Sequence, residues 1–91
     1  MEIILSKYGE VISTDEKSFE IYKILKKGID SGDIVTIDAK NVTISTKSAR
    51  IIFGKLYKEL KNLFNEKIKI KNASSLFTFS VNEGIATELA N

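Results

Sequence analysis

The chain has 91 residues, the size of one domain with a modest core, and we expect a single domain over residues 1–91. It is 43% hydrophobic and 29% charged, with a net charge of +2. This mixture is typical of folded proteins and is too balanced to indicate nucleic-acid binding by itself. Cysteine and histidine are both absent, which excludes disulfides, thiolate metal sites and histidine-based catalysis. We therefore expect no metal, no cofactor and no enzymatic activity.

The first ten residues, MEIILSKYGE, contain an apolar run of four residues that follows an acid. This run is too short and wrongly flanked to be a signal peptide or a membrane span. We therefore expect a cytoplasmic protein that does not associate with a membrane. The short apolar strands EIIL and EVIS lie on either side of SKYG, whose glycine favours a turn, and this pattern predicts a β-hairpin.

A helix is predicted after the hairpin. Ser13 and Glu16 have the spacing of a capping box, in which a hydroxyl and a carboxylate satisfy the free N–H groups of the first turn. Apolar residues then recur at helical spacing as far as Ile29, and Gly32 can end the helix.

The rest of the chain predicts two more strands and two more helices. The β-branched run in DIVTIDA indicates a buried central strand, and a helix follows at about residues 47–64. In EKIKIKN, apolar residues alternate with lysines, which predicts a strand with one exposed face. Ser74 or Ser75 then begins the last helix.

These elements predict an α/β fold in the order β-β-α-β-α-β-α. Crossovers between parallel strands are nearly always right-handed and place their helices on one face of the sheet. The lysine row indicates that the opposite face meets solvent. We therefore expect a four-stranded mixed sheet with its helices mainly on one face.

The junction between the third strand and the second helix is rich in polar side chains. Asp38 ends the strand, and hydroxyls gather at the start of the helix, at Ser45, Thr46 and Ser48. A hydroxyl at this position is the preferred helix cap, so Ser45 or Thr46 is expected to be one. The free N–H groups of a helix start also suit a phosphate, and Lys47 adds a positive charge.

Three segments together resemble the STAS-like domain family of bacteria and archaea, which is named for its likeness to anti-sigma factor antagonists. They are EVISTDEKSFEIYKIL, DIVTIDAKNVTISTKSARIIFGKL and KIKIKNAS, and they cover most of the chain up to about Ser75. The resemblance implies a STAS-like, non-enzymatic regulatory module that binds a protein, with an ATP-binding, histidine-kinase-like protein as the partner. In true antagonists the junction carries a phosphorylated serine; here STKSAR replaces that motif, and Ser48 and Thr46 are the candidate phosphoacceptors.

The surface expected to bind the partner is the strand-to-helix junction around residues 38–51, where cationic, amide and hydroxyl side chains surround one exposed isoleucine. Its residues are Asp38, Lys40, Asn41, Ser45, Thr46, Lys47, Ser48, Arg50 and Ile51.

Other functions stay open at this point. The row of Lys67, Lys69 and Lys71 could follow a nucleic-acid backbone, although no aromatic residues alternate with it for base stacking, so nucleic acid is the less favoured partner. Asp38 with a lysine could instead form a small catalytic site. Phe77 and Phe79 cannot both face inward from one helix, and we expect Phe77 to pack in the core. A homodimer interface is one way to cover the aromatic ring that faces outward.

Overall fold

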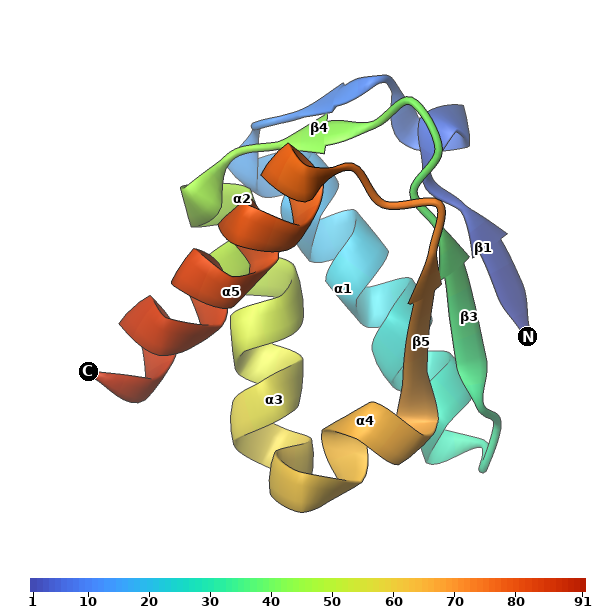
Figure 1. Cartoon of the computed structure of the whole chain (residues 1–91). Coiled ribbons are helices and arrows are strands. Elements are labelled where there is room, and N and C mark those ends of the chain that lie inside the picture. Colours follow the sequence, from blue (N-terminus) through green and yellow to red (C-terminus); the bar gives the residue numbers. More distant parts are fainter.

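Two small parallel sheets form the β-structure, as the computed structural model of residues 1–91 shows (Figure 1). The larger has the order β1-β3-β5 and contains β1 (Glu2–Ile4), β3 (Val35–Asp38) and β5 (Ile68–Lys71). The smaller pairs β2 (Val11–Ile12) with β4 (Thr43–Ile44). All three pairings are parallel. The chain is therefore an α/β protein, with three and two strands in separate sheets in place of the predicted four-stranded mixed sheet.

The predicted N-terminal hairpin is wrong. The segment between β1 and β2 forms a 3₁₀ helix, η1 (Leu5–Tyr8), whose Leu5 is completely buried. Burial of this side chain favours the helical turn, which carries the chain away from β1. β1 then pairs with β3, with Ile3 opposite Ile37, and β2 is left to pair with β4.

The first and last helices begin at hydroxyl caps. α1 (Asp15–Asp30) is capped by Thr14, whose hydroxyl accepts a bond from the Lys17 N–H at 3.3 Å, so the predicted cap at Ser13 is one residue too early. α5 (Ser75–Leu89) is capped by Ser74, one of the two serines expected there.

The predicted middle helix is present but irregular. It begins as α2 (Thr46–Ala49), widens into a π-helical segment, η2 (Arg50–Gly54), and returns to α3 (Lys55–Leu60). The short helices η3 (Lys61–Leu63) and α4 (Phe64–Lys67) then lead directly into β5. The extra residue in the π-helical turn shifts which side chains face the core along the rest of the helix.

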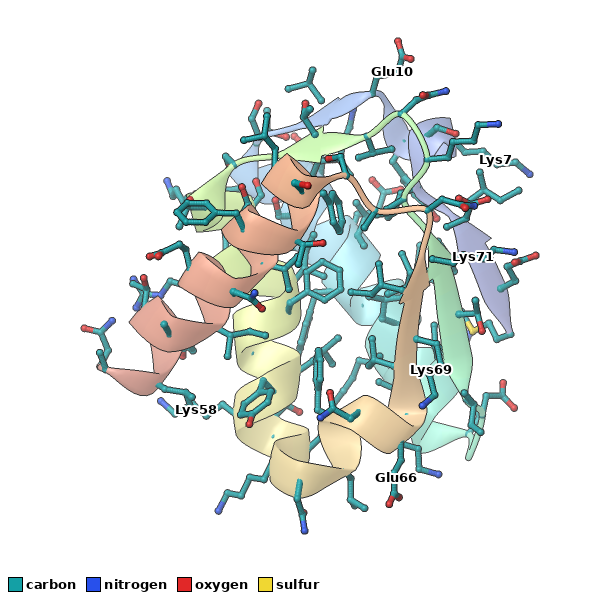
Figure 2. The ribbon with its side chains drawn as sticks, in the orientation of Figure 1. Lys7, Glu10, Lys58, Glu66, Lys69 and Lys71 are labelled. Carbon is teal, nitrogen blue, oxygen red and sulfur yellow. The ribbon has the colours of Figure 1, made fainter.

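The larger sheet has one buried and one exposed face. Ile3, Val35, Ile37 and Ile68 are buried beneath the helices, which lie on that side of the sheet (Figure 1). The opposite face exposes side chains of β1 and β5, including Lys69 and Lys71 (Figure 2). The prediction that the lysine strand has one exposed face is therefore confirmed.

α5 packs very closely against η2. A methyl group added at Gly84 would lie 2.6 Å from the backbone N of Arg50 and 2.7 Å from the carbonyl carbon of Ala49, and one at Gly54 would lie 3.0 Å from the Gly84 carbonyl oxygen. Phe53 and Phe77 meet edge to face across the same contact, with ring centroids 6.2 Å apart. The two glycines therefore allow a helix–helix approach that no larger residue would permit.

Gly84→Ala should lower the free energy of unfolding by about 2 kcal/mol, because the new methyl group meets backbone atoms that cannot move aside. Gly28→Ala is the matched control: Gly28 is also helical and buried, but its methyl group would mainly meet the flexible Met1 side chain. The control should stay within about 1 kcal/mol of wild type, since alanine also favours the helix. Urea unfolding measures both, and equal effects of the two substitutions would contradict the close packing.

Candidate functional site

Asp38 ends β3 at the carboxyl edge of the larger sheet and links two loops. One carboxylate oxygen, Oδ1, accepts a bond from the side-chain N–H of Asn72 at 3.0 Å and from the backbone N–H of Lys40 at 3.1 Å. Asn72 follows β5, the neighbouring parallel strand. The Asn72 and Lys40 donors hold the pKa of Asp38 below its ordinary value of 3.8. The ionised carboxylate of Asp38 therefore connects the loops that follow β3 and β5 through hydrogen bonds.

An open hollow of about 510 Å³ lies beside these loops. Lys40 and Asn41, two of the predicted site residues, form part of its wall. Asn41 and Asn72, one from each loop, both have a backbone φ of 61°, a left-handed conformation that asparagine tolerates better than most residues. The remaining lining residues are Glu10, Val42, Thr43, Asn72, Ala73 and Ser74.

The sequence reasoning missed Glu10 and Asn72. Asn72 could have been found, because it directly follows the alternating strand and a parallel pairing with β3 brings the ends of the two strands together. Glu10 could not have been found from the sequence, because it lines the hollow only as a result of the unexpected pairing of β2 with β4.

The hydroxyl of Ser45 is the helix cap, as expected for one of the two candidates. It accepts a bond from the Ser48 N–H at 3.0 Å. Thr46 and Lys47 are exposed in the first turn, and the Lys47 ammonium lies 3.2 Å from the carboxylate of Asp15. Because Asp15 begins α1, this ion pair places the starts of α1 and α2 side by side.

The rest of the predicted surface is largely withdrawn from solvent. Ser48 is only 1% exposed, so a kinase cannot reach its hydroxyl in this conformation, and Thr46 is the accessible candidate phosphoacceptor. The Arg50 side chain donates to Glu88 on α5 at 2.9 Å, and Ile51 is half-buried. Arg50, with Lys58 nearby, keeps the pKa of Glu88 below its ordinary value. The exposed part of the site therefore runs from Asp38 to Lys47.

The lysine row is partly engaged within the chain. Lys71 forms an ion pair with Glu2 of β1, while the Lys69 ammonium donates to the Asn65 carbonyl at 2.6 Å. Lys67 ends α4 and does not belong to β5. The three lysines are thus not an evenly spaced row of free cations.

Comparison with protein-family models, curated proteins and solved structures finds no match to this chain. None of its helices combines the length and apolar character needed to cross a bilayer. The structure contains no cluster of three or more acidic side chains arranged to hold a metal ion. The assignment of function therefore depends on the geometry of the junction and on the sequence resemblance.

Asp38→Asn should destabilise the protein near neutral pH and have little effect in acid. Asparagine keeps an acceptor oxygen for both bonds but lacks the charge. Since the folded-state pKa of Asp38 is lowered, its charge stabilises the fold above about pH 3.8, and this contribution is lost as the pH falls through the folded pKa. The measurement is the Tm of both proteins from about pH 7 to pH 2. A difference in Tm that does not change with pH would contradict this role.

Ser48→Ala and Ser18→Ala should have opposite effects. Both serines are buried, but the Ser18 hydroxyl donates to the Thr14 carbonyl at 2.7 Å, whereas the Ser48 hydroxyl has no hydrogen-bond partner in the chain. Removing an unsatisfied hydroxyl should raise the free energy of unfolding by up to about 1 kcal/mol, and removing a bonded one should lower it by about 1 kcal/mol. Chemical unfolding of both variants tests this, and a loss of stability in Ser48→Ala would show that its hydroxyl has a partner after all.

Proposed function

We propose that the protein is a non-enzymatic, cytoplasmic regulatory module of STAS-like type that binds a partner protein through its strand-to-helix junction. The observation that carries the proposal is the course of residues 40–47. They lead from the carboxyl end of β3 in the larger sheet to the start of α2, with polar side chains exposed around an open hollow. In parallel α/β sheets this edge is the usual place for a binding site. We call Asp38, Lys40, Asn41, Thr46 and Lys47 the junction surface.

The chemistry of the junction surface suits a transient protein interface. It offers two lysines and an amide, with Glu10 and Asp15 as neighbouring acids. Val11, which pairs in register with Thr43, is 64% exposed and supplies an apolar contact beside the hollow. An exposed apolar side chain next to polar groups of mixed charge is typical of interfaces that form and dissociate readily.

The state of Asp38 argues against a catalytic role. Both of its donors bind the same carboxylate oxygen, and its pKa is below the ordinary value. A general base works best with a pKa close to the working pH, and this carboxylate has been shifted in the opposite direction.

The resemblance to the STAS-like family extends the proposal to the nature of the partner. It supports an ATP-binding, histidine-kinase-like protein, with Thr46 as the hydroxyl open to phosphorylation. A phosphate there would add about two negative charges beside Asp15, enough to break a contact that depends on Lys40 and Lys47.

Lys40→Glu and Val11→Asp should each reduce capture of the partner from extracts of the native host by about tenfold. The first reverses a charge on the junction surface, and the second places a charge in its apolar contact. Lys23→Glu is the matched control, because Lys23 is an exposed lysine in the middle of α1. Immobilised proteins and quantitative mass spectrometry give the readout.

A protein captured equally by wild type and by both junction variants would rule out the junction surface. Failure of the wild type to retain any protein above the level of an unrelated control would rule out the interaction module itself. Melting curves for each variant show that lost capture does not reflect unfolding.

A further inference from the structure

A second concave surface lies on another part of the molecule, between β5 and α5. It is a groove of about 510 Å³, and nine of its twelve lining residues are hydrophobic. Ile70 of β5 and Phe64 of α4 border one side, and Phe77, Val81 and Ile85 of α5 border the other. This size and character match sites that bind apolar side chains.

The edge of β5 next to this groove is unpaired. β5 is the outer strand of the sheet and pairs with β3 alone. The Lys71 carbonyl accepts a bond from the Ala39 N–H on the β3 side at 2.9 Å. Because backbone groups alternate in direction along a strand, the N–H and C=O of Ile70 face away from β3. No hydrogen bond outside the β3–β5 pair involves the Ile70 backbone.

The groove itself is uncharged, because neither an acidic nor a basic residue lines it. Positive charge lies on the other face of the strand beside it. On the exposed face of β5, Lys69 and Lys71 project from the strand (Figure 2). Lys71 is paired with Glu2, but the Lys69 ammonium contacts only a backbone carbonyl and has no carboxylate partner.

We propose that this groove binds an extended peptide segment of a partner protein, which adds to β5 as an outer strand of the sheet. The peptide would bond to the N–H and C=O of Ile70. Its side chains would point alternately into the groove and toward Lys69, so a sequence that alternates apolar and acidic residues fits best. This surface shares no residue with the junction surface, and the inference goes beyond the function proposed above.

A second copy of the chain fits this edge less well than an acidic peptide does. Pairing two β5 strands edge to edge would bring the Lys69 and Lys71 side chains of one copy against those of the other. Like charges directly opposite one another destabilise a strand pair. A free apolar molecule would fill the groove but would leave the backbone of Ile70 unpaired.

The probes are capped heptapeptides in which Glu alternates with Val, Ile, Leu or Phe. Each has two matched controls, one with Lys in place of Glu and one with N-methylated backbone nitrogens that cannot join a sheet. We expect at least one Glu peptide to bind with a Kd at least tenfold lower than either control, by fluorescence polarisation. Hydrogen exchange measured by NMR should show the Ile70 amide slowed at least tenfold in the complex.

Protein variants locate the site. Ile85→Glu and Leu89→Glu alter groove residues, one half-buried and one 53% exposed, and each should weaken binding at least tenfold. Leu76→Glu is the matched control, since Leu76 lies on α5 outside the groove and is 71% exposed. Lys69→Glu should weaken binding severalfold, and this effect should shrink at high salt.

Several results would overturn the proposal. One is that no Glu peptide binds at millimolar concentration. A second is that the N-methylated peptides bind the wild-type protein as tightly as the unmodified Glu peptides do. A third is that the Leu89→Glu variant binds a Glu peptide as tightly as the wild-type protein does. A dimer seen by light scattering in wild type and lost in Leu89→Glu would assign the groove to a second copy instead. Because the junction variants leave this groove unchanged, failure here and failure of the proposed function are distinguishable.

Discussion

The close contact between η2 and α5 determines most of what the surface of this protein can do. Gly54 and Gly84 bring the two helices together until backbone touches backbone, and the Phe53–Phe77 pair fixes their relative position. This placement of α5 covers the backbone at Ala49 and engages Arg50 through Glu88. The same placement sets one side of α5 opposite the free edge of β5, where the apolar groove forms. The extent of the junction surface and the existence of the groove are therefore two results of one packing constraint.

Parallel pairing explains which loops meet at the junction. β3 and β5 end at the same edge, which brings Asn72 within hydrogen-bonding distance of Asp38. β2 and β4 also run in parallel, and each leads within a few residues into a helix, so that Asp15 and Lys47 pair. Three segments that are far apart in the sequence, residues 10–15, 38–47 and 72–74, thus contribute to one surface without any long loop.

Local signals in the sequence were enough to predict the three main helical segments and the exposed lysine strand, but not η1 or the irregular course of the middle helix. Serine and threonine caps and a strict alternation of side chains depend on neighbours within a few residues. Strand pairing was not predictable in this way. β4 has only two residues, too few to show an alternation of side chains. The sequence pattern of β1 and β2 is typical of a hairpin, but burial of Leu5 favours a helical turn between them. For the candidate site, the sequence predicted the position of Asp38 at the end of a strand and the hydroxyl cap of the helix that follows. It also favoured Phe77 over Phe79 as the inward ring of the last helix, and Phe77 is buried. The burial of Ser48 was not predictable, because it depends on tertiary packing and not on neighbours in the sequence.

The hollow beside the junction surface and the groove beside β5 have one lining residue in common. Ala73 lines both the polar hollow at the junction and the apolar groove beside β5. A peptide added to β5 in the direction of the strand would pass Ile70 and reach Ala73, where the hollow begins. One partner chain could therefore place an extended segment along β5 and its folded part against the junction surface. Such a bivalent contact would gain affinity from the second site through high effective concentration, without either surface being large. The junction surface is small and of mixed charge, so by itself it suits only a weak interface. A second contact along β5 would explain how one partner is nevertheless recognised specifically.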